Sequence, residues 1–162
     1  MLMLEDLDAI DRHLLQLLQK DASRSTAELA EAVGLSQAPC WRRIQRLKDA
    51  GILQKQVYLV DRRKIGLNAQ LYALVKLTAH ARANLAAFEE AIREFPEVQD
   101  CYVLLGSVDF ILRIVTRDIE SYEQFFLKRL ALIPGIQEVN SMVALSEIKH
   151  TLELPIERLT PS

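Results

Sequence analysis

Two helix signals separated by a glycine turn constrain the fold of this chain more than any other feature. Ser25 and Glu28 match a capping box that opens one short helix. Gly34 stands where a left-handed residue would end that helix. Ser36 is a second good N-cap, and a further helix is predicted over residues 37–50. An apolar stripe in residues 7–18 predicts one more helix before them, so the pattern is typical of a helix-turn-helix.

Basic residues concentrate around this motif although the whole chain carries a net charge of −2. Residues 24–64 hold nine Lys and Arg against four Asp and Glu, which gives +5 there and −7 in the remainder. A basic segment in an acidic chain favours a domain that binds a polyanion such as DNA.

The helix over residues 37–50 has two faces. Cys40, Ile44 and Leu47 share one face and are expected to pack inward, whereas Arg42 and Arg46 are expected on the opposite side. Cations on a surface helix are often only solvated, but together with the preceding capped helix and glycine turn they favour DNA contact. Trp41 fits either a core position or a groove contact. The candidate DNA-binding residues are Ser25, Ser36, Gln37, Ala38, Trp41, Arg42, Arg43, Gln45 and Arg46.

The chain is expected to contain two domains. Residues 52–60 lack a helical period and are rich in β-branched side chains, which predicts a strand. The charged stretch that follows ends in turn formers, so we expect a DNA-binding domain at 1–60, a linker at 61–69 and a second domain at 70–162.

The second domain is predicted to be α+β with a ferredoxin-like βαββαβ order. Strands are expected at 70–78, 98–105, 110–116 and 139–146, and helices at 84–95 and 118–132. The strands are apolar on both faces, and two helices cover only one face of such a sheet. A second copy of the chain is the economical cover for the other face.

Several classes of function find no support. No apolar run is long enough to span a bilayer, so no membrane partner is expected. The acidic start lacks the pattern of a signal peptide, which favours a cytoplasmic protein. Cys40 and Cys101 are far apart and resemble no metal or redox motif. We find no catalytic motif either, and therefore expect no enzyme, no catalytic residues, no metal and no cofactor.

Residues 35–47 (LSQAPCWRRIQRL) and the following Gly51-Ile52 resemble the recognition helix of the Lrp/AsnC family, the feast/famine regulators. Residues 106–110 (GSVDF) resemble that family's Gly-Asp-Tyr-Asp turn, and residues 132–136 and 147–149 also match. The resemblance implies a winged-type helix-turn-helix, a ferredoxin-like effector domain, homodimers that pair through their sheets, and often octamers. It also implies sequence-specific regulation of transcription by a small effector, a free amino acid bound between effector domains.

The turn at residues 106–109 is the candidate effector loop. Its backbone amides suit a carboxylate and the Asp109 carboxylate suits an ammonium, so one loop offers groups for both ends of an amino acid. A carboxylate that caps a β-turn is an equally good interpretation of Asp109. Ile119, Met142 and Ala144 follow from the resemblance as receivers of the effector side chain. The candidate effector-binding residues are Gly106, Ser107, Val108, Asp109, Ile119, Met142 and Ala144.

Two rival functions remain open at this stage: a small-molecule enzyme of ferredoxin-like fold, and an amino-acid-binding module without DNA function. The lack of catalytic motifs argues against the enzyme, and the N-terminal sixty residues argue against the module. Ser107 and Val108 replace the commoner Asp-Tyr of the family turn, which leaves the effector open among leucine, methionine and cysteine. The operator, the regulated genes and the direction of regulation do not follow from the sequence.

Overall fold

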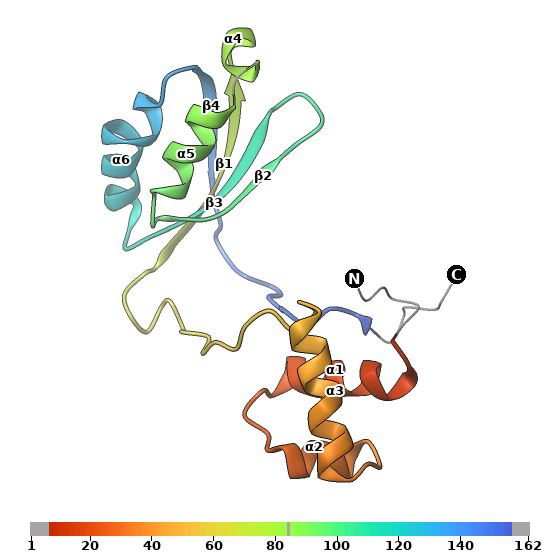
Figure 1. Cartoon of the computed structure of the whole chain (residues 1–162). Coiled ribbons are helices and arrows are strands. Elements are labelled where there is room, and N and C mark those ends of the chain that lie inside the picture. Colours follow the sequence, from red (N-terminus) through yellow and green to blue (C-terminus); the bar gives the residue numbers. More distant parts are fainter. Residues whose placement is uncertain (1–6, 84, 157–162) are drawn as a thin grey trace. The chain divides into compact units, whose positions relative to one another are not determined.

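The computed structural model describes residues 7–83 and 85–156. They form two compact units (Figure 1). One unit combines residues 7–59 with 149–156, and the other holds residues 60–148. The segment 149–156 therefore belongs with the N-terminal helices, whereas the sequence placed it in the second domain.

The first unit contains the three predicted helices: α1 (Ala9–Lys20), α2 (Thr26–Ala32) and α3 (Gln37–Asp49). Ser25 and Glu28 form the expected capping box at the start of α2. Gly34 has a φ of 70°, the left-handed geometry that lets the chain turn sharply between α2 and α3. Ser36 does occupy the N-cap of α3, but its side chain makes no cap hydrogen bond, contrary to expectation.

Apolar side chains from all three helices make the core of this unit. Leu14, Leu29, Cys40 and Ile44 are among its buried members. A second cluster joins Leu7, Leu15 and Leu47 to Ile156 from the far end of the described chain. Just before Ile156, the Leu154 N–H donates to Gln19 Oε1 at 2.7 Å, and Gln19 Nε2 donates to the Leu154 carbonyl at 3.3 Å.

The strand predicted over residues 52–60 is wrong for this structure, because the described residues between α3 and the first strand of the sheet form none. The side chains of Val57, Tyr58, Leu59 and Val60 are exposed. A strand needs a neighbour to accept its hydrogen bonds, and no described segment pairs with this one. The β-branched composition therefore gives an unpaired extended segment.

The second unit has the predicted βαββαβ order. Its main elements are β1 (Ala69–Leu77), α5 (Ala86–Arg93), β2 (Val98–Val103), β3 (Phe110–Thr116), α6 (Ile119–Lys128) and β4 (Ile136–Val143). Two short elements supplement them: α4 (Ala79–Arg82) after β1, and the 3₁₀ turn η2 (Leu130–Leu132) after α6. The sheet is antiparallel with the order β2-β3-β1-β4, which confirms the ferredoxin-like prediction. β4 begins three residues earlier than predicted, directly after Pro134-Gly135.

The two faces of this sheet differ. One face packs against α5 and α6, where Phe88, Ile92, Tyr122 and Phe125 meet the buried side chains of β1 and β3 (Figure 1). Side chains alternate along a strand, so the intervening residues lie on the other face, which no described helix covers. That open face carries Tyr72, Leu74, Tyr102, Ile111 and Met142.

Candidate nucleic-acid interface and effector loop

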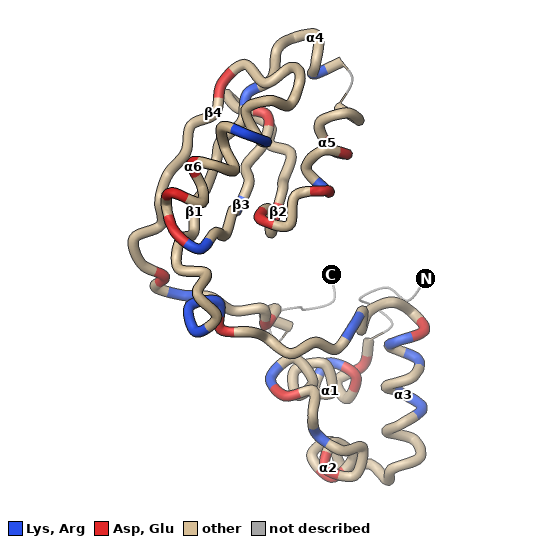
Figure 2. The backbone as a smooth tube through the Cα atoms, turned by 90° about the vertical axis from the view of Figure 1, so that its left-hand side faces the viewer, with Lys and Arg blue, Asp and Glu red and all other residues tan. Residues whose placement is uncertain are grey.

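Helix α3 has a buried face and an exposed face. Cys40, Ile44 and Leu47 are buried, as predicted. Four candidate residues at the beginning of α3 are exposed together: Gln37, Ala38, Trp41 and Arg42. Gln45 is half-buried one turn further on. Figure 2 shows the Lys and Arg positions along α3.

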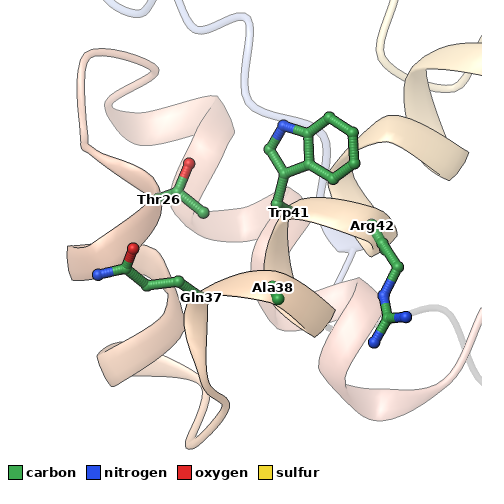
Figure 3. A pocket seen from close by; sticks show the side chains of 5 residues that line it. All are labelled: Thr26, Gln37, Ala38, Trp41 and Arg42. Atoms are coloured by element: carbon green, nitrogen blue, oxygen red, sulfur yellow. The ribbon is translucent and has the colours of Figure 1, made fainter.

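Trp41 is not a core residue. Its side chain is 54% exposed, and it lines an open hollow with Thr26, Gln37, Ala38 and Arg42 (Figure 3). Of the two interpretations that the sequence left open, the structure therefore excludes burial in the core of this unit.

Arg43 and Arg46 point to α1 and are not free. Arg43 Nη1 lies 2.6 Å from Asp8 Oδ2 and 2.9 Å from Asp11 Oδ1, and Arg46 Nη2 binds Asp11 Oδ2. Asp11 is completely buried. Hydrogen bonds to Asp11 and then to Asp8 raise the pKa of the Arg43 guanidinium. The expectation that Arg46 faces freely outward beside Arg42 is therefore corrected: its long side chain reaches back to a buried carboxylate.

One sequence signal could have revealed this ion pair. Asp11 lies one turn after Leu7 and one turn before Leu15, within the apolar stripe of α1. A carboxylate in such a stripe is buried on folding and needs a cationic partner. In the structure Arg43 and Arg46 of α3 supply that partner.

The two serines among the candidates lie at the N-caps of α2 and α3, but only the Ser25 side chain makes a cap hydrogen bond. The Ser25 hydroxyl donates to Glu28 Oε2 at 2.7 Å and accepts from the Glu28 N–H at 3.3 Å. Both Ser25 and Ser36 are exposed, so both hydroxyls remain accessible from outside.

In the second unit, Asp109 ties the loop before β3 to β1 and α4. Its Oδ2 accepts from the Leu77 N–H at 2.7 Å and from Arg82 Nε at 3.1 Å, and Arg82 Nε lies 3.0 Å from Oδ1. The Leu77 hydrogen bond and then Arg82 hold the pKa of Asp109 below its usual value. The carboxylate is therefore anionic at neutral pH and already holds a cation. Sequence reasoning missed Arg82.

The rest of the loop offers unused amides. Among the described residues, the N–H groups of Gly106, Ser107 and Val108 have no hydrogen-bond acceptor. Gly106 does not have a positive φ, and a Cβ there would meet open space. The turn therefore does not require glycine at this position.

The candidate effector residues fall into two groups within one chain. Asp109 lies beside Val75, near one end of β1. Ala144 bonds to Gln70, and β3 reaches Ile119 just after Thr116 pairs with Ala69, so both lie near the other end. Met142 pairs with Tyr72 between them. The six residue steps from Ala69 to Val75 span about 20 Å. One chain therefore does not bring Ile119 or Ala144 close to Asp109.

Within residues 7–83 and 85–156, no helix has the length and apolar character needed to cross a bilayer. In the same residues, the acidic, histidine and cysteine side chains form no cluster of three or more that suits a metal ion.

Comparison with known proteins covers both units. Residues 7–48 match the AsnC-type helix-turn-helix domain, and residues 70–154 match the Lrp/AsnC ligand binding domain. Among curated relatives, the DNA-binding transcriptional activator DecR of Escherichia coli is 40% identical over 93% of this chain and 99% of its own. Transcriptional regulator AzlB of Bacillus subtilis is 39% identical over 94% of this chain and 98% of its own.

Two solved structures of transcriptional regulators also match most of this chain. An AsnC family transcriptional regulator from Agrobacterium tumefaciens matches with a TM-score of 0.89 and 38% identity, over 95% of this chain and all of the other. A transcriptional regulator from Neisseria meningitidis in complex with L-Met matches with a TM-score of 0.87 and 35% identity, over 93% of this chain and 97% of the other. The chain therefore belongs to the Lrp/AsnC family of DNA-binding transcriptional regulators.

Proposed function

We propose that this chain regulates transcription by placing the first half of α3 in the major groove of duplex DNA, under the control of a free amino acid. The observation that carries the proposal is the exposed group Gln37, Ala38, Trp41 and Arg42 on α3, opposite a buried face. Recognition helices of this motif contact base edges with their N-terminal residues. The family and the name of its relative DecR support DNA as the partner.

Arg42 is the cation that we expect to contact DNA. It is exposed and makes no ion pair with any described residue, whereas Arg43 and Arg46 are held by α1. Arg42→Ala should weaken binding to genomic fragments, including the one upstream of the protein's own gene, in a gel shift. If Arg42 contacts a phosphate, the salt slope should also fall by about 0.9. Arg93→Ala is the matched control, because Arg93 is exposed on α5 in the other unit. Equal affinity of both variants and wild type would contradict this role.

We further propose that the ammonium of the effector replaces Arg82 at Asp109, while amides of residues 106–108 bind the effector carboxylate. Asp109 already holds the Arg82 guanidinium, which shows that its surroundings accept a cation. The related regulator in complex with L-Met supports a free amino acid as the class of ligand. Because Ile119 and Ala144 lie near the opposite end of the sheet, they can complete such a site only from another copy of the chain.

Calorimetric titration with each of the twenty amino acids tests this site. Asp109→Asn keeps an acceptor for the Leu77 N–H but removes the charge, so it should weaken binding by about 2–5 kcal/mol without loss of the fold. Arg82→Ala should strengthen binding, because it removes the internal competitor. Wild type that binds none of the amino acids, or Asp109→Asn that binds as tightly as wild type, would contradict the proposal.

We also propose that the open face of the sheet pairs with a second copy, and that dimers assemble further into octamers. Leu74→Asp places a charge in the middle of that face and should yield monomers in light scattering of the full chain. Leu127 is 54% exposed on α6, so Leu127→Asp is the control that should leave the assembly intact. A wild-type monomer at micromolar concentration would contradict the pairing.

As a transcription regulator the protein acts where the DNA lies, so we place it in the cytoplasm and expect no catalytic activity. The two rival functions predict a different result in the gel shift. An enzyme or an isolated amino-acid-binding module would bind no genomic fragment, whereas the proposed regulator binds some fragments in preference to others.

A further inference from the structure

The hollow at the beginning of α3 has an apolar centre between two polar side chains. Figure 3 shows Trp41 and Ala38 between Gln37 on one side and Arg42 on the other. Thr26 of α2 also lines the hollow, and none of its five lining residues is acidic. Its surface therefore combines apolar contact area with one amide, one hydroxyl and one cation.

Trp41 belongs to neither core cluster of its unit. It is the one large apolar side chain of α1, α2 and α3 that is exposed, whereas Cys40 beside it is buried. An indole in water forgoes a large apolar contribution to stability, and tryptophan is enriched where a partner covers it. The position of Trp41 on the exposed face of the recognition helix means that this partner approaches from the DNA side.

We propose that Trp41 and Ala38 form a seat for the 5-methyl group of a thymine in the major groove. The thymine methyl is the apolar group that base pairs present in that groove, and alanine and aromatic side chains are its usual contacts. Gln37 and Arg42 beside the seat match the polar edges of adjacent base pairs and the negative charge of the duplex. The inference rests on the proposed DNA-binding function and adds one base feature that the protein reads.

The test starts with duplexes selected from a random pool by the full-length wild type. The selected half-site should contain an invariant thymine. Deoxyuridine at that position keeps the hydrogen-bonding edge and lacks only the methyl group. Burial of a methyl-sized group predicts that this exchange weakens wild-type binding about fourfold. Trp41→Ala should bind the thymine and deoxyuridine duplexes equally, whereas Trp41→Phe should retain part of the difference.

Fluorescence gives a second readout, because Trp41 is the only tryptophan of the chain. The selected duplex should shift its emission and protect it from acrylamide quenching. Circular dichroism of Trp41→Ala should match wild type, since a half-exposed side chain contributes little to the core. If Trp41→Ala is unfolded, the affinities of Trp41→Phe for the thymine and deoxyuridine duplexes are compared with those of wild type instead.

The outcomes separate the seat from the wider function. A pool that yields no preferred sequence would overturn sequence-specific DNA binding itself. A clear consensus whose thymines can all be exchanged for deoxyuridine without loss would overturn the seat and leave the function standing. A Trp41 that stays fully open to acrylamide in the complex would also overturn the seat.

Discussion

Exchange of the buried carboxylate of Asp11 for an amide should destabilise the DNA-binding unit by about 2 kcal/mol. Asp11→Asn removes two charge-assisted interactions, with Arg43 at 2.9 Å and with Arg46. Removal of one partner from a buried ion pair costs about 3–5 kcal/mol when a buried charge is left alone. Here the side chains that lose their partner are 28% and 45% exposed, so water recovers part of that cost.

The assay is urea denaturation of the full chain, followed by circular dichroism and by Trp41 emission, since Trp41 reports on this unit alone. With a urea m-value of about 1–3 kcal/mol/M for a small domain, 2 kcal/mol corresponds to a fall of roughly 0.7–2 M in the urea midpoint. Asp8→Asn is the control. Asparagine can still cap α1, and the pair that is lost has a side chain that is 50% exposed, so it should cost less than about 1 kcal/mol. Equal effects of the two variants, or no effect of Asp11→Asn, would refute the role of burial.

Three further predictions concern other parts of the chain. Ile156→Ala should destabilise the first unit by about 2–5 kcal/mol in the same urea assay, and an unchanged midpoint would show that the cluster with Leu47 is dispensable. Gly135 has a φ of 91° and a Cβ there would lie 2.4 Å from the Cβ of Ala81, so Gly135→Ala should lower the melting temperature clearly, whereas Gly106→Ala should not. Ser121 lowers the pKa of Asp118 to about 2 from 3.8. The stability that the ionised Asp118 side chain contributes is therefore complete above about pH 4 and is lost as the pH falls towards 2. The free energy of unfolding of Asp118→Asn should therefore approach that of wild type as the pH falls from about 4 towards 2. A difference that stays constant over this range would contradict the pKa assignment.

Local signals predicted most of the fold because they act within a few residues. The capping box at Ser25 and the glycine turn at Gly34 form as expected, and α6 begins directly after Asp118, at the start of the predicted helix. The βαββαβ order also followed from short periodic segments. Such features depend on the chain nearby, which the sequence shows directly.

Long-range contacts were not predicted, because they depend on residues that are far apart in the sequence. Periodicity places Arg46 on the outer side of α3, but only the packing of α1 shows that Asp11 draws it back. Arg82 reaches Asp109 across 27 residues of sequence. The β-branched residues 52–60 have the composition of a strand, but a strand also requires a partner, which composition does not report.

The contact between Leu47 and Ile156 has a consequence for biosynthesis. A ribosome that has released α1, α2 and α3 must still make the whole sheet domain before Ile156 can join their core. At ~5–20 residues per second, those roughly hundred residues correspond to a delay of about 5–20 s. During that time the helices lack one of their core side chains. A chain that stops after β4 would then carry a complete sheet but a weakened DNA-binding unit, so premature termination would impair DNA recognition before it impairs the sheet domain.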